Sequence, residues 1–198
     1  MVKRLTSVVA LSLLVLGALA FAQQPGATTA RTPEAASIKA AAEISSRAFM
    51  SGDFARLLDL TYPKLIELGG GREKMLAAIE GQLKEMRDEG MKIVSHTIGE
   101  PEPSVRAGSQ LVAIVPVELG MESSEYIIRQ KSFWLAVSED EGKTWKFLSG
   151  GSLSEDVLKL LLPEAAGKIT LPAEALPSMK RKTAKPKAGG ASRRKYRR

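Results

Sequence analysis

Apolar residues change their spacing near residue 91, from a helical period to a strand period. Before it they recur every three or four positions, which is typical of the buried face of an amphipathic helix. Thr32 followed by Pro33 favours a helix start, and Asp53 caps a second helix. Gly52 and Gly90 stop the helices before them. The pattern predicts helices over residues 33–51, 54–61 and 72–89, and leaves the short run 65–68 unassigned.

The third predicted helix carries an apolar stripe that we expect to lie in the core. Its members share one helical face and include thioethers, which fill irregular gaps in protein interiors. They are Met75, Leu76, Ile79, Leu83 and Met86.

After residue 91 the alternation predicts an antiparallel sheet. The expected strands span residues 91–98, 110–121, 126–138 and 145–150, with a short edge strand inside the proline-bearing connection 99–109. Residues 111–117 are apolar on both faces, which is typical of a central strand covered on both sides. The two periods together predict the α+β class, with N-terminal helices followed by an antiparallel sheet.

The segment from Ser132 to Gly150 predicts a β-hairpin with a polar loop. Within it, Ser138, Asp140, Gly142, Thr144 and Trp145 follow an S-x-D-x-G-x-T-W order. The short side-chain oxygens can accept bonds from loop N–H groups, while the glycine adopts a left-handed conformation and the tryptophan covers the turn. We expect this motif to be structural, not catalytic.

Both faces of this hairpin are apolar. If Ser138 pairs with Trp145, then Ala136 lies opposite Phe147, and the hairpin buries one face against the helices. The other face requires either a partner subunit, which would make a homodimer, or the C-terminal segment. A short helix at residues 157–162, capped by Ser152 with Glu155, and an extended strap at 171–177 follow.

Residues 1–22 have the features of a secretory signal peptide. Two basic residues precede a long apolar run that ends at Ala20-Phe21-Ala22, the small-x-small spacing of a cleavage site. Cleavage would export the chain to the periplasm or the exterior. Without cleavage the same run would anchor it to a membrane. Residues 23–32 are expected to form a flexible leader.

Charge is segregated along the chain, whose formal net charge is +7. Ten of the 29 basic residues lie in the segment 180–198, whereas the domain is mildly acidic. We expect residues 178–198 to form a disordered basic tail that either solubilises the chain or binds a polyanion: an anionic envelope polymer, lipid headgroups or extracellular nucleic acid. The candidate polyanion-binding residues are Lys180, Arg181, Lys182, Arg193, Arg194, Lys195, Arg197 and Arg198.

The order of elements over residues 33–162, three helices leading into long antiparallel strands, resembles the nuclear transport factor 2-like superfamily. The hairpin resembles the Asp-box hairpin of sialidase-like propellers. The superfamily resemblance implies one α+β domain, at residues 33–177, in which the N-terminal helices pack on a curved antiparallel sheet, like a cone. It also implies a cavity between the helices and the concave face of the sheet. Family members use that cavity for isomerisation, dehydration, cyclisation or ligand binding.

Few side chains in this sequence could carry chemistry. The absence of cysteine and the single histidine exclude thiolate and multi-imidazole metal sites, and we predict no metal, no cofactor and no catalytic residue. His96 is expected to lie between Val94 and Ile98 on one strand face. An aromatic set with one cation is typical of small-molecule pockets. The candidate pocket residues are Tyr62, His96, Tyr126, Arg129 and Trp134.

The sequence therefore predicts an exported small-molecule-binding or protein-interaction module of unknown ligand. The alternative is a small cavity enzyme that catalyses acid–base isomerisation, hydration or hydrolysis.

Overall fold

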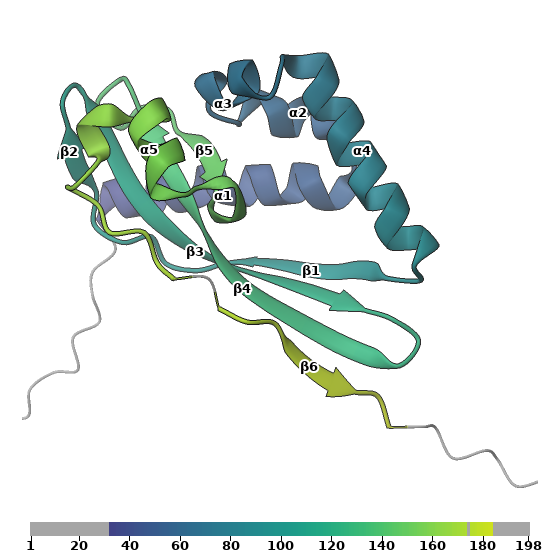
Figure 1. Ribbon diagram of the computed structural model, residues 1–198. Coiled ribbons are helices and arrows are strands. Elements are labelled where there is room, and N and C mark those ends of the chain that lie inside the picture. Colours follow the sequence, from purple (N-terminus) through teal and green to yellow (C-terminus); the bar gives the residue numbers. More distant parts are fainter. Residues whose placement is uncertain (1–31, 174, 184–198) are drawn as a thin grey trace, which may run out of the picture. The chain divides into compact units, whose positions relative to one another are not determined.

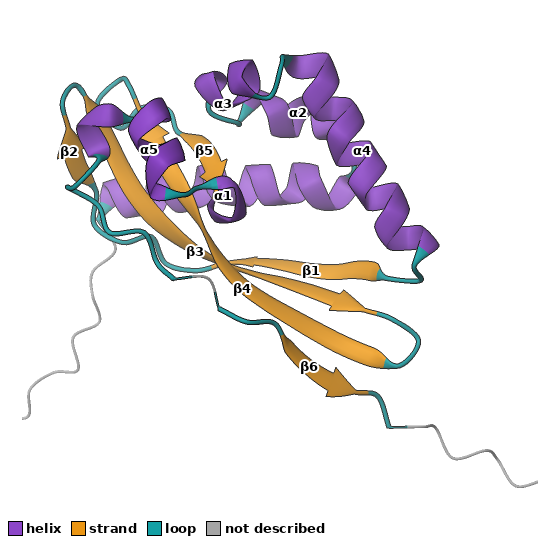
Figure 2. Ribbon diagram, viewed as in Figure 1, coloured by secondary structure: helices purple, strands orange, loops and turns teal. Residues whose placement is uncertain are grey.

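A computed structural model describes residues 32–173 and 175–183, and these residues form an α+β fold (Figure 1). Helices occupy the N-terminal part and pack against a curled antiparallel sheet, as the spacing of apolar residues predicts (Figure 2). The helices are α1 (Pro33–Ser51), α2 (Phe54–Asp59), α3 (Pro63–Leu68), α4 (Arg72–Asp88) and α5 (Glu155–Leu161). The predicted signal peptide and leader lie outside the described residues, apart from Thr32.

Local caps set both ends of α1 and the start of α2. The Thr32 hydroxyl accepts a hydrogen bond from the N–H of Ala35 at 3.1 Å, and Asp53 accepts one from the N–H of Arg56 at 3.0 Å. Gly52 adopts a left-handed conformation with φ of 76° at the end of α1. These predicted boundaries are confirmed.

The second helix ends two residues earlier than predicted, and the unassigned run 65–68 forms part of α3. Residues 60–62 leave the helix because they pair with the edge of the sheet. The N–H of Phe147 donates to the carbonyl of Leu60 at 2.8 Å, and the N–H of Tyr62 donates to the carbonyl of Phe147 at 3.0 Å. Pro63 then starts α3, where its missing N–H is not needed.

The sheet has the order β1-β3-β4-β5. The short β2 pairs with the beginning of β3, on the edge whose later part pairs with β1, and β6 pairs with the beginning of β4. All of these strand pairs are antiparallel. The longest ladder joins β3 and β4, and its register runs from Leu111 opposite Ser138 to Glu122 opposite Ile127. The strands are β1 (Lys92–Ile98), β2 (Val105–Ala107), β3 (Gln110–Glu122), β4 (Tyr126–Ser138), β5 (Lys146–Ser149) and β6 (Ser178–Arg181).

Both faces of the β4–β5 hairpin are buried, in the register that the sequence predicts. Ala136 lies opposite Phe147, and these two side chains pack with Trp145 against Ile38 and Ala42 of α1. The opposite face belongs to a second buried cluster, which includes three leucines from the segment that follows β5. They are Leu158, Leu161 and Leu162. Of the two covers that we expected for this face, the C-terminal segment is the one present in the structure. The homodimer stays a prediction, but this face no longer supports it.

The cap of α5 differs from the prediction. The hydroxyl of Ser154, not that of Ser152, accepts a hydrogen bond, which the N–H of Val157 donates at 3.2 Å. Ser152 belongs to a 3-10 turn (Gly150–Ser152) in which the N–H of Leu153 bonds the carbonyl of Gly150. With Ser154 as its cap, the helix begins at Glu155, two residues before the predicted start, and it ends at Leu161, one residue before the predicted end.

The predicted start of the disordered tail, at Ser178, is wrong. Residues 178–181 form β6, which pairs with Tyr126–Arg129 of β4. The reason is that β5 covers only the later part of β4, so the backbone groups at its beginning are free to pair. The ion pairs Arg181–Glu125, at 3.5 Å, and Lys182–Glu122, at 2.9 Å, accompany this pairing.

Hydrogen bonds of the loop between β4 and β5 match those expected from its sequence. The hydroxyl of Ser138 donates to Asp140 at 2.8 Å and accepts from the N–H of Gly142 at 2.8 Å. Asp140 accepts from both the N–H and the hydroxyl of Thr144, at 2.9 and 2.7 Å. These bonds lower the pKa of Asp140 to about 2. Gly142 has φ of 82°, and Trp145 is buried beside it. The resemblance to an Asp-box hairpin stays a prediction.

We expect Gly142→Val to lower the free energy of unfolding by roughly 1–3 kcal/mol, the cost range of sparsely populated backbone states. A Cβ at this position would lie 3.5 Å from the Trp145 ring, an ordinary contact, so the cost arises from the left-handed backbone and not from a clash. Gly142→Asn is the matched control, because asparagine tolerates this conformation, and it should lose less. Urea unfolding measures both. Equal stability of the valine variant and the unaltered chain would contradict the described loop.

Candidate functional site

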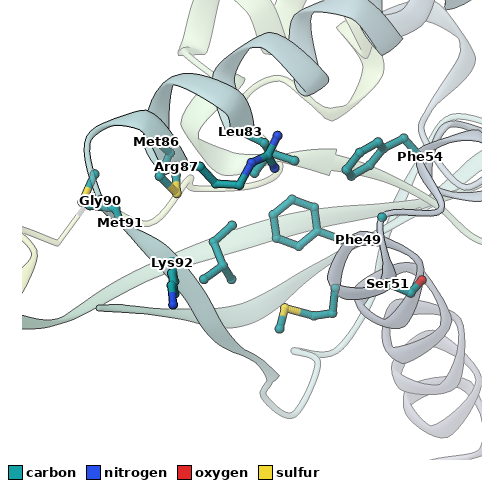
Figure 3. Close-up of a pocket in the computed structure, with 12 residues that line it drawn as sticks. Phe49, Ser51, Phe54, Leu83, Met86, Arg87, Gly90, Met91 and Lys92 are labelled. Carbon is teal, nitrogen blue, oxygen red and sulfur yellow. The ribbon is translucent and has the colours of Figure 1, made fainter. Parts of the chain in front are cut away.

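An open apolar groove of about 600 Å³ lies where α1, α2, α4 and β1 meet (Figure 3). Phe49 stands near its middle and Phe54 closes one end, while α4 supplies Leu83 and Met86 from above. Met91, just before β1, and Ile93, near its beginning, complete the apolar wall. This size and lining are within the usual range for small-molecule sites.

The groove exists because α4 does not fully bury its apolar stripe. None of its residues is buried, and the five stripe residues predicted as core are only half-buried. At its end the chain turns back sharply, because Gly90 has φ of 77° and the N–H of Met91 donates to the carbonyl of Met86 at 2.9 Å. The turn sets Met86, Met91 and Ile93 around one hollow.

Arg87 is the principal charged group of the groove. It extends from α4 over the hollow, whereas the amine of Lys92 points away from Phe49 (Figure 3). The neighbouring acid Asp88 is engaged by Lys84 at 2.5 Å, and Arg87 forms no ion pair with any described residue. The apolar groove thus carries a guanidinium group that has no ion pair within the described residues.

Behind the groove, His96 lies in a row of aromatic rings. Its ring centroid is 5.6 Å from that of Phe49, which lines the groove, and 5.0 Å from that of Trp134. Its Nδ1 lies 2.9 Å from the hydroxyl oxygen of Ser46. Burial lowers the pKa of His96, because the charged imidazolium loses its hydration there.

The five pocket residues predicted from sequence do not converge. Tyr62 is buried in the core cluster beside α5, and its hydroxyl lies 3.2 Å from a Glu139 oxygen and 3.1 Å from the Gln110 side-chain nitrogen. This burial raises the pKa of the phenol. Only His96 and Trp134 of the five are in contact, and neither lines the groove.

The remaining two predicted residues lie near the beginning of β4. Tyr126 pairs with β6, opposite Arg181. Arg129 forms an ion pair with Glu118 at 2.7 Å, and it projects from the sheet face opposite to that of Trp134 because the two positions differ by an odd number of residues.

His96 was predicted to share one strand face with Val94 and Ile98, but a β-bulge at Val94 changes this arrangement. The register of β1 against β3 shifts between Ile93 and Ser95, so Val94 is the extra residue. Val94 is therefore 47% exposed, whereas Ile93 turns into the groove. Sequence alternation treats Val94, His96 and Ile98 as one face and so misses Ile93.

The other groove residues were also missed, because Phe49, Leu83 and Met86 have the spacing of core positions. The one local signal is the αL-forming Gly90 followed by Met91, which brings the end of α4 and the start of β1 together. No periodicity reveals that the space between them stays open.

No group of three or more acidic, histidine or cysteine side chains in the described ranges could hold a metal ion. Among the described helices, none has the length and apolar character that crossing a bilayer requires.

Comparison with known proteins gives no relative: no family model matches the chain, and neither a curated protein nor a solved structure is detectably similar to it. The resemblance to the nuclear transport factor 2-like superfamily therefore stays a prediction.

We expect the stability of this protein to fall as the pH drops from about 7 to 5, and His96 to cause part of that fall. The folded chain keeps this imidazole neutral below its ordinary pKa of 6.5. In that window the unfolded chain binds more protons, so lowering the pH favours unfolding. Urea unfolding at several pH values should show a shallower dependence in His96→Leu. Identical slopes in both proteins would contradict the buried, neutral imidazole.

Proposed function

We propose that this chain is an exported binding module whose groove takes the apolar part of a small amphiphile with an anionic group. The observation that carries the proposal is the combination of an open apolar groove and an arginine that no described acid neutralises. The part of the proposal that concerns export rests on the signal-peptide pattern of residues 1–22.

The lining favours a flexible alkyl or isoprenoid chain as the bound part. Phe49, Phe54, Leu83 and Met86 present carbon and sulfur atoms, and thioethers adapt to ligands of irregular shape. Each methylene group transferred from water into such a site contributes roughly 0.8 kcal/mol. Affinity should therefore rise about fourfold per added methylene until the groove is full.

Arg87 would select the headgroup more than it would tighten binding. An exposed ion pair contributes only about 0–1 kcal/mol, whereas a guanidinium matches the two oxygens of a carboxylate or phosphate. A ligand with a carboxylate, sulfate or phosphate group at one end of the chain fits this arrangement.

The basic C-terminal residues support a tether to anionic envelope polymers or lipid headgroups as a second part of the proposal. Of the eight candidate residues, Lys180, Arg181 and Lys182 are described. Arg181 forms an exposed ion pair with Glu125 of the β3–β4 turn, and Lys182 forms a partly exposed one with Glu122 at the end of β3. Such pairs are weak in salt solution and compete little with a polyanion. Arg193, Arg194, Lys195, Arg197 and Arg198 lie outside the described residues.

We expect Leu83→Ser to weaken binding of long-chain alkyl sulfates about tenfold or more, because burial of a leucine side chain contributes roughly 1.5–3 kcal/mol. Leu76→Ser is the matched control. It changes the same residue type on the same half-buried stripe of α4, outside the groove. Isothermal titration calorimetry with alkyl sulfates of increasing length measures both affinities. Equal affinities in the two variants, or no binding by the unaltered chain, would overturn the proposal.

A second variant pair isolates the headgroup. Arg87→Gln should weaken binding of an alkyl sulfate a few-fold and leave an uncharged alkyl glycoside of the same length unaffected, in keeping with the modest strength of exposed ion pairs. Lys84→Gln, one turn away and paired with Asp88, should change neither. Loss of both ligands in Arg87→Gln would show that the residue shapes the groove instead of reading the charge.

A further inference from the structure

A second hollow flanks the end of α1, next to the groove. It has a volume of about 560 Å³ and is lined by Ile44, Arg47, Asp53 and Arg56, and it shares Met50 and Ser51 with the groove. The two hollows therefore form one continuous surface around the last turn of α1. We call this surface the α1-end face.

Apolar side chains on the α1-end face are exposed to solvent. Ile44 is 37% exposed and Met50 is 42% exposed, although each borders a hollow. Single exposed apolar residues are common on soluble proteins. Here they continue the apolar lining of the groove to the surface, which is unlike an isolated residue.

The arginines among the described residues divide into those that form an ion pair and those that do not. Four are in ion pairs with carboxylates: Arg72 with Asp59, Arg106 with Glu141, Arg129 with Glu118 and Arg181 with Glu125. The other three, Arg47, Arg56 and Arg87, have no ion pair within the described ranges. All three line the two hollows, and Asp53, which caps α2, is the acid among the lining residues.

We propose that the α1-end face docks onto an anionic lipid surface, from which the groove exchanges its amphiphile. This inference rests on the proposed function, because it assigns the source of the same ligand. Unpaired guanidinium groups bind lipid phosphates, and the apolar side chains between them enter the headgroup region. A dissolved polyanion would bind the arginines but would leave Ile44 and Met50 in water. A membrane would bind the arginines and also remove these two apolar side chains from water.

The chain contains no cysteine, which allows a single reporter group to be placed on this face. Ile44→Cys carries an environment-sensitive fluorophore on the second hollow, outside the groove. Leu160→Cys is the control, because Leu160 is 63% exposed and belongs to α5, which covers the opposite sheet face. The full chain is mixed with vesicles of phosphatidylcholine alone or of equimolar phosphatidylcholine and phosphatidylglycerol, each with brominated acyl chains.

On the anionic vesicles, the fluorophore at position 44 should shift its emission to the blue and lose most of its intensity to the bromine quencher. The fluorophore at position 160 should do neither, and pure phosphatidylcholine should have little effect at either position. The basic tail alone could hold the chain on anionic vesicles, but it would not quench one face selectively. Equal quenching at both positions, or none at position 44, would overturn the docking proposal.

Charge reversal separates this inference from the proposed function. Arg47→Glu combined with Arg56→Glu should abolish the quenching at position 44 and leave calorimetric binding of a dissolved alkyl sulfate unchanged. If the sulfate fails to bind the unaltered chain while position 44 is quenched, the proposed function falls and the docking face remains. If the sulfate binds and position 44 is not quenched, the groove takes its ligand from solution.

Discussion

The long β3–β4 ladder is the constraint on which the rest of the structure depends. It joins residues 111–122 to residues 127–138, and its first half is apolar on both faces. An antiparallel pair with two apolar faces must be covered twice. On one face α1 packs against Ala113, Val115 and Ala136, and on the other the leucines of α5 pack against Val112 and Leu135. The closed core therefore lies at this half of the ladder.

The helices cover the sheet less completely towards the other half of the β3–β4 ladder. The buried contacts of α1 run from Ile38 and Ala42 to the end of the helix, where Gly52 turns the chain away. At the start of β1, Leu83 and Met86 of the half-buried α4 stripe stand across an open groove from Met91 and Ile93. Phe49 is both the last aromatic residue of the core row and the centre of the groove wall. The groove thus lies at the edge of the core, and the same helices and strands that form the core also form its walls.

Elements with local causes were predicted correctly from the sequence. The caps at Thr32 and Asp53 and the left-handed Gly52 and Gly142 follow from residues a few positions apart. The pairing of Ala136 with Phe147 follows from the short loop between the two strands. The order of helices and strands, and hence the α+β class, followed from two periodicities.

The features that escaped prediction depend on distant partners. The bulge at Val94 is set by the register against β3, and β6 forms because β5 leaves the beginning of β4 unpaired. Tyr62 was assigned to a pocket, but pairing of residues 60–62 with β5 carries it into the core instead. The groove itself depends on how far α4 stands above β1, which no spacing of apolar residues encodes.

Methionine methyl resonances offer the most direct test of the groove as a ligand site. Met50, Met86 and Met91 line it, whereas Met75 lies near Gly69 at the other end of α4 and Met179 lies on β6. In the full chain with labelled methionine methyl groups, titration with dodecyl phosphate below its micellar concentration should shift the first three resonances saturably and leave Met75 and Met179 in place. Shifts spread evenly over all of these methionines, or no saturable shift in any, would contradict the account.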